Sequence, residues 1–188
     1  GQYALYYNST GNFNSALGDN ALTSTTGGSN TGIGQSSGST ITTGSNNTTV
    51  GYNAQVPTAN GSNQVRIGNT FISYAGIQVA WTITSDKRLK SDIQNSNLGL
   101  AFINKLRPVS YTRNNDATKK VEYGFIAQEI EDALKISGAS NNGIISKDDN
   151  GMYGVRYNDL LSPLVKAIQE QQQMIEELKK EIEALKNK

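Results

Sequence analysis

The feature that most constrains the fold is a short repeat in the first part of the chain. In each of four copies a glycine is followed three residues later by asparagine or glutamine, then by an apolar residue and a closing glycine. The closing glycines, spaced 16, 17 and 17 residues apart, are Gly18, Gly34, Gly51 and Gly68. A unit of this length cannot bury a core alone, so it must stack on its neighbours or on other chains.

One apolar residue precedes each closing glycine and is flanked by polar positions. These residues are Leu17, Ile33, Val50 and Ile67. The pattern predicts a strand with one buried side chain per turn, and glycine allows close backbone approach at the corners. We therefore predict a β-roll or β-prism over residues 1–84. The alternative is a disordered linker rich in Gly, Ser, Thr and Asn, which the fixed phase of the apolar–glycine pairs disfavours.

The four copies resemble the Asn/Gly-rich head repeats of trimeric adhesins and phage fibre shafts, in which such units stack along a trimer axis. The resemblance covers about residues 1–68 and implies a surface fibre in a homotrimer. Residues 65–83 are rich in β-branched and aromatic side chains and are interrupted by Gly76. They predict two short strands that end the fibre. We expect Trp81 to be a packing residue there.

The charge of the chain changes abruptly near residue 85. The only charged side chains before Ser85 are Asp19 and Arg66, although 18% of the whole chain is charged. The composition therefore predicts two physically different parts joined at this point. We place the domain boundaries at 1–84 for the fibre end, 85–157 for a globular α+β domain, and 158–188 for a C-terminal helix.

Several kinds of chemistry are excluded by composition. The chain has no cysteine and no histidine, which removes disulfides, thiol nucleophiles, histidine-based triads and the usual zinc sites. We expect no metal and no cofactor. A net charge of +1 does not indicate the excess of basic residues that nucleic-acid binding requires. No apolar run approaches the ~18 residues of a membrane span. The start lacks both a signal-peptide pattern and a methionine, so we expect a piece of a longer protein.

The charged half predicts an alternation of short elements. Pro108 ends the first helix, and turn residues separate the strands. The expected elements are a helix over 97–106, a strand over 109–112, a return strand over 119–123, a helix from 124 to 134, and a hairpin formed by 144–146 and 154–157.

A single helix is predicted from Asn158 to the end, with Asn158 or Asp159 as its cap and Pro163 in its first turn. Its apolar residues follow a heptad that predicts a coiled coil: Leu161, Leu164, Ile168, Ile175, Leu178, Ile182 and Leu185. Gln171 occupies the one polar core position. Isoleucine at heptad position a together with leucine at heptad position d favours, by itself, a parallel dimer. A shared axis with trimeric repeats favours a trimer, which we choose.

A candidate for chemistry lies at the charge boundary, where Ser85 and Lys90 are five residues apart. A serine hydroxyl needs a base to remove its proton, and a lysine can serve where burial lowers its pKa. The competing interpretation is structural, because Ser-Asp pairs cap helices and lysines are usually solvated. On spacing alone, Ser91-Asp92 is almost as good a candidate.

The string from Ser85 to Ile93, SDKRLKSDI, resembles the S-D-x-R-x-K-x-x-I signature of the endosialidase-type intramolecular chaperone, the auto-cleaving C-terminal domain of phage tailspikes and tail fibres. Further matches are LRPVSY at 106–111, GFIAQEI at 124–130 and YNDLL at 157–161. The resemblance implies that Ser85 is the nucleophile, that Lys90 is its base, and that the Thr84–Ser85 bond is cut. Asp86 and Arg88 are candidates to orient the loop or bind the oxyanion.

The function that the resemblance implies is a C-terminal chaperone that trimerises and registers a tail fibre or tailspike of the virion and then releases itself, after assembly in the host cytoplasm. The alternative is a non-cleaving trimerisation tip of an adhesin on a bacterial surface. A membrane-anchored transcription factor precursor is disfavoured by the repeat and by the lack of a basic region. A glycosidase site is disfavoured because residues 1–83 hold one carboxylate, Asp19, where a pair is needed.

Overall fold

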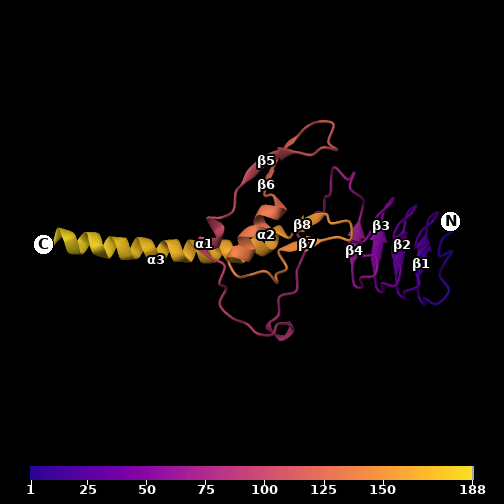
Figure 1. Cartoon of the computed structure of the whole chain (residues 1–188), viewed down its shortest axis with the longest axis horizontal. Helices are drawn as coiled ribbons and strands as arrows, with labels where there is room; N and C mark the ends of the chain where they lie inside the picture. The colour runs from indigo at the N-terminus through magenta and orange to yellow at the C-terminus, as the bar shows by residue number, and fades with distance from the viewer. Residues whose placement is uncertain (188) are drawn as a thin grey trace. The chain divides into compact units, whose positions relative to one another are not determined.

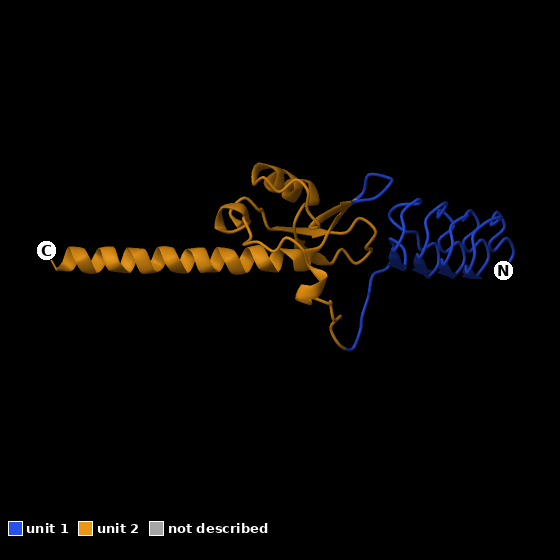
Figure 2. Cartoon of the chain, turned by 90° about the horizontal axis from the view of Figure 1, so that it is seen from below, with its two compact units in different colours: residues 1–78, 147–152 blue, residues 79–146, 153–188 orange. Residues whose placement is uncertain are grey.

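The computed structural model describes residues 1–187 and divides into two compact units. The first unit holds residues 1–78 together with the loop 147–152, and the second holds residues 79–146 and the described residues after 152 (Figure 2). The loop therefore belongs to the first unit although its neighbours in the sequence belong to the second. No helix among residues 1–187 combines the length and the apolar character that a membrane crossing requires.

The first unit is built on a parallel sheet with one short strand per repeat copy (Figure 1). Its strands are β1 (Ser15–Leu17), β2 (Thr31–Ile33), β3 (Thr48–Val50) and β4 (Val65–Ile67). The register pairs Leu17 with Ile33, Ile33 with Val50, and Val50 with Ile67. Each repeat copy thus stacks directly on the preceding one, which is the arrangement that its spacing predicts.

The apolar residues before the closing glycines form an outward-facing apolar stripe, made up of Leu17, Ile33, Val50 and Ile67. Leu17 is 67% exposed and Ile67 is 66% exposed. The prediction that this residue is the buried one of each turn is wrong for the single chain. Side chains alternate along a strand, and the middle residue of each three-residue strand is its least exposed one, buried in β2 and β3. The interior is instead filled by Leu22, Ile41 and Val56.

Buried amide side chains tie one coil to the next. The Asn30 side chain donates to the Gly44 carbonyl at 2.9 Å, and its Oδ1 accepts from the Asn47 backbone N–H at 3.0 Å. Asn47 repeats the pattern on the Gly61 carbonyl at 2.8 Å. Both asparagines are fully buried, so these bonds satisfy polar groups that water cannot reach. The coils lie so close together that a Cβ added to Gly27 would be 2.0 Å from the Gly44 carbonyl oxygen.

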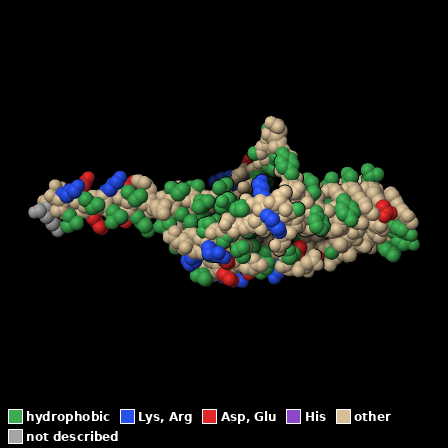
Figure 3. Space-filling view, turned by 90° about the horizontal axis from the view of Figure 1, so that it is seen from above, with side chains coloured by type: hydrophobic (Ala, Val, Ile, Leu, Met, Phe, Trp, Pro, Cys, Tyr) green, Lys and Arg blue, Asp and Glu red, His purple; other side chains and the backbone are tan. Residues whose placement is uncertain are grey.

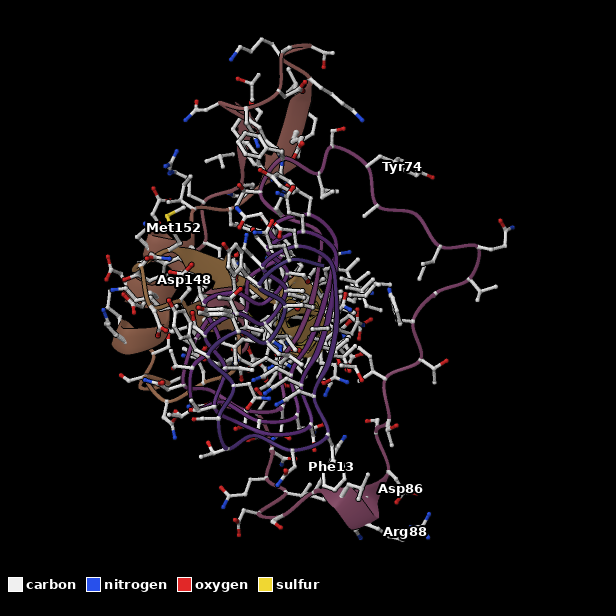
Figure 4. The ribbon with its side chains drawn as sticks, turned by 90° about the vertical axis from the view of Figure 1, so that its right-hand side faces the viewer. Phe13, Tyr74, Asp86, Arg88, Asp148 and Met152 are labelled. Atoms are coloured by element: carbon white, nitrogen blue, oxygen red, sulfur yellow. The ribbon has the colours of Figure 1, made fainter. Side chains whose placement is uncertain are left out.

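The junction after β4 differs from the sequence prediction. Residues 70–84 contain no helix or strand, so the second of the two expected strands is absent. Trp81 is 75% exposed, which contradicts its expected packing role in the single chain. Tyr74 likewise extends from an open stretch of backbone (Figure 4). A strand needs a pairing partner, and the described residues 1–187 offer none to this segment.

The second unit contains small antiparallel pairs and three α-helices. Its elements after the junction are α1 (Leu100–Ile103), β5 (Val109–Thr112), β6 (Val121–Gly124), α2 (Ala127–Ile136), β7 (Ile145–Lys147), β8 (Tyr153–Val155), the 3₁₀ turn η2 (Tyr157–Leu160) and α3 (Leu161–Lys186). The predicted strand at 109–112 is confirmed. Helix α2 begins at Ala127 rather than at Gly124, because Gly124 pairs with Val109 in the β5–β6 ladder.

The core of the second unit gathers side chains from both early helices and from the end of the chain. Phe102 of α1 and Ile130 and Leu134 of α2 are almost completely buried. The remaining buried members of this cluster are Leu98, Ala133, Ile144 and Leu160. Helix α1 is shorter than the 97–106 segment that its periodicity predicts, but Leu98 and Phe102 do occupy the core as that spacing requires.

Helix α3 confirms the predicted long C-terminal helix, although its cap differs. The cap position is Leu160, without a side-chain hydrogen bond, and Asp159 forms an ion pair with Arg156 at 3.3 Å. The predicted capping by Asn158 or Asp159 is therefore wrong. The heptad residues lie on the surface with exposed fractions from 42% to 68%, and Figure 3 shows apolar side chains beside charged ones along this helix. Pro163 and Ala167, near its start, are buried.

A carboxylate of α3 closes the start of α1. The Leu100 backbone N–H donates to Glu170 Oε2 at 2.7 Å, and Lys166 pairs with Glu170 Oε1 at 3.0 Å. Helix α1 has no side-chain cap of its own, because its cap residue is Gly99. The Leu100 hydrogen bond and the Lys166 pair lower the pKa of Glu170.

This cap predicts a pH-dependent contribution to stability. A depressed carboxyl pKa adds stability that is present above its unfolded value and lost as the pH falls through the folded value. We expect Glu170→Gln to lower the melting temperature at pH 7, and the difference from wild type to shrink as the pH falls below the usual carboxyl range. Thermal unfolding followed by circular dichroism measures this. Glu181→Gln, further along α3, is the control; an equal effect there contradicts the assignment.

Candidate active site at the junction

The predicted site lies on a short turn near the start of the second unit. The 3₁₀ turn η1 spans Lys87–Leu89, and the Asp86 carboxylate caps it by accepting the Arg88 backbone N–H at 2.8 Å. The Lys90 backbone N–H then donates to the Lys87 carbonyl at 3.1 Å. The turn reverses the chain between Ser85 and Lys90, so two residues five positions apart can meet.

Ser85 and Lys90 do meet in this structure. Lys90 Nζ donates to Ser85 Oγ at 2.6 Å, and both residues are exposed. An amine in contact with a serine hydroxyl can accept its proton once the amine is neutral, so the pair can act as a base and a nucleophile. Thr84, which precedes Ser85, is exposed and lies in a stretch without regular structure.

Asp86 and Arg88 pair with each other rather than with the dyad. The Arg88 guanidinium donates to Asp86 Oδ1 at 3.0 Å and to Oδ2 at 2.8 Å, and Figure 4 shows both side chains at the same short turn. This pairing lowers the pKa of Asp86 and raises that of Arg88. Of the two roles expected for these residues, the geometry fits orientation of the loop, because each satisfies the other at the turn.

The other segments that carry the family resemblance also come together. The Tyr157 hydroxyl accepts the Phe125 backbone N–H at 3.2 Å, and the two rings lie 6.2 Å apart. A Cβ on Gly124 would lie 2.4 Å from that hydroxyl oxygen, which accounts for glycine at this position. The LRPVSY and GFIAQEI segments are joined by the β5–β6 pairing and by an ion pair between Arg107 and Glu129. This ion pair lowers the pKa of Glu129.

A comparison with protein families identifies the domain type of part of the second unit. Residues 85–138 match the family model described as the chaperone of endosialidase, which also carries a peptidase name. The chain therefore contains an endosialidase-type chaperone domain, and the resemblance seen in the sequence is confirmed over these residues. The match begins at Ser85, covers less than a third of the chain, and ends before the YNDLL segment and α3. No curated protein showed significant similarity to the chain.

The described part of the chain offers no group of three or more carboxylate, histidine or cysteine side chains that could hold a metal ion. Sequence reasoning missed two residues that make long-range contacts, Glu170 and Asp149. Glu170 caps a helix 70 residues away in the sequence, and Asp149 contacts a residue 90 positions away. Neither contact leaves a signal in a single sequence, because both depend on how distant segments pack.

Proposed function

We propose that this chain ends a β-structured tail fibre or tailspike, and that its second part is an intramolecular chaperone that trimerises the chain, registers the fibre and then removes itself by cutting the Thr84–Ser85 bond. The observation that carries the proposal is the 2.6 Å contact between Lys90 Nζ and Ser85 Oγ at the first residue of the chaperone match. The chain would act once, on itself.

In the proposed reaction, Lys90 in its neutral form takes the proton of Ser85 Oγ, which attacks the carbonyl carbon of Thr84. The C–N bond of the Thr84–Ser85 peptide breaks, and the proton on Lys90 passes to the departing Ser85 nitrogen. An ester between the Thr84 carbonyl and Ser85 Oγ remains. Water hydrolyses this ester, which gives a Thr84 carboxylate and restores the Ser85 hydroxyl next to a new amino terminus.

The exposure of the dyad supports a link between assembly and cleavage. Burial disfavours the charged form of a lysine, so a lysine base works best where water is excluded. Ser85 and Lys90 are both exposed in the single chain. In the proposal, neighbouring copies of the chain bury Ser85 and Lys90, so that cleavage occurs only after the trimer has formed.

Two unpartnered apolar surfaces support the homotrimer. The heptad residues of α3 are exposed on a helix that carries charge on its other faces, which is typical of a coiled-coil strand. In the apolar stripe of the first unit, Leu17, Ile33 and Ile67 are exposed and Val50 is half-buried, on four strands in register. Contact between copies at both surfaces would align the repeats and offset the cost of pairing distant β-segments.

After loss of the chaperone, the fibre would depend on kinetic stability, that is, on slow unfolding. A fibre without the domain that registers its chains would refold poorly once unfolded. The virion tail is the proposed location of the fibre, with the chaperone released in the host cytoplasm. Intact-mass measurement of the purified wild-type chain tests the proposal: we expect fragments of residues 1–84 and 85–188. A chain that stays whole when folded and trimeric would contradict it and leave the non-cleaving adhesin tip.

A further inference from the structure

The last coil of the repeat ends in a backbone edge that would remain open without a further residue. At one corner the coils are linked in series. The Thr26 N–H donates to the Thr42 carbonyl at 2.7 Å, and the Thr42 N–H donates to the Ala59 carbonyl at 3.0 Å. The next link would run from the Ala59 N–H to a fifth coil, but the repeat pattern stops at Gly68.

A carboxylate takes the place of the missing carbonyl. The Ala59 N–H donates to Asp149 Oδ2 at 2.7 Å. The backbone of the same residue makes a second bond, from the Asp149 N–H to the Pro57 carbonyl at 2.9 Å. Asp149 therefore supplies at Ala59 the acceptor that a following coil would supply, and it adds a donor to the Pro57 carbonyl.

The loop that carries Asp149 is held by its own contacts. The Asp148 carboxylate accepts the backbone N–H groups of Asn150 at 2.9 Å and Met152 at 2.8 Å, and the Asp148 N–H donates to the Met152 carbonyl at 3.0 Å. Figure 4 labels Asp148 and Met152, which lie close together. Gly151 has a φ of +79°, a conformation that favours glycine in a tight turn. One aspartate thus shapes the loop, and the next is free to bond the coil.

We propose that the loop 147–152 is an edge cap for the last coil of the repeat, in which the Asp149 carboxylate replaces the carbonyl of an absent fifth coil. Unpaired β-edges are templates for aggregation, and stacked repeats need caps at their ends. One consequence rests on the proposed function: a cut after Thr84 would leave Asp149 on the released piece. The cap would then protect the fibre end during assembly and depart with the chaperone.

The test measures amide hydrogen exchange in the full-length chain carrying Ser85→Ala, so that the outcome does not depend on cleavage. We expect Asp149→Ala to speed exchange of the Ala59 amide about five- to tenfold, because a hydrogen bond to a charged acceptor is lost. The Thr42 amide, one coil inward, should keep its rate. Asp132→Ala, which removes another surface carboxylate, is the matched control and should change neither amide.

Asp149→Asn keeps the size of the side chain and one oxygen acceptor, so it should fold normally and give an intermediate rate at Ala59. Unchanged Ala59 exchange in both Asp149 variants would overturn the cap, as would an equal rise at Ala59 and Thr42. These outcomes are separate from those of the proposed function: a wild type that never cleaves contradicts the peptidase and leaves the exchange result standing.

Discussion

A chain carrying Ser85→Ala should fold and assemble but remain a single polypeptide. The substitution removes the hydroxyl oxygen to which Lys90 is hydrogen-bonded, so no ester with Thr84 can form. We expect the fragment of residues 85–188, which the wild type should release, to be absent from a denaturing gel and from the intact-mass spectrum. Loss of a nucleophile typically reduces such a reaction by about a millionfold, far below detection in a single-turnover assay.

Lys90→Ala should have the same result, because it removes the base and leaves the serine in place. Two matched controls are close in sequence. Ser91→Ala removes a neighbouring serine that is almost as plausible on spacing alone, and Lys87→Ala removes a lysine of the same turn; both should still cleave. Cleavage by either the Ser85 or the Lys90 variant, or loss of cleavage in the Ser91 variant alone, would show that the dyad is wrongly assigned.

An aspartate in the heptad of α3 should dissociate the proposed trimer. Ile175 occupies a core position of the predicted coiled coil and is 45% exposed in the single chain. In a trimer, Ile175→Asp would bury three unpaired carboxylates on one axis, and a buried charge without a partner is strongly unfavourable. We expect sedimentation of the Ser85→Ala chain to show a trimer, and the added Ile175→Asp to weaken association by about a hundredfold or more.

Gln173→Asp introduces the same charge two residues earlier, on the outward side of the helix, and should leave the trimer intact. With Ser85 restored, Ile175→Asp should also slow cleavage, since the dyad would lose its cover. A monomeric Ile175→Asp chain that cleaves at the wild-type rate would show that cleavage does not depend on trimerisation. A Gln173→Asp chain that also dissociates would contradict the heptad assignment itself.

The parts of the molecule that the sequence predicted correctly depend on local rules. The spacing of glycines sets one strand per repeat, and the heptad sets a long helix, because side-chain period follows directly from backbone geometry. Pro108 and the turn residues around Asn115 delimit the strands β5 and β6. The approach of Lys90 to Ser85 also follows from a local turn, which is why five residues of spacing were informative.

The errors arose where an apolar residue was taken to be buried within its own chain. Leu17 and Ile67 face outward, and Trp81 is exposed, although each was expected to pack. Apolar character shows that a side chain favours leaving water, but it does not say which surface covers it. The missing second strand at the junction has the same origin, since β-branched residues form a strand only where another strand is available.

The sequence by itself determined the repeat, the charge boundary at residue 85, the long helix and the pairing of Ser85 with Lys90, because each is written in residues close together along the chain. Only the tertiary structure decided that Glu170 caps α1 and that Asp149 ends the coil edge. The physical reason is that a hydrogen bond needs its two atoms within about 3 Å. For partners 70 or 90 residues apart, packing alone brings them that close.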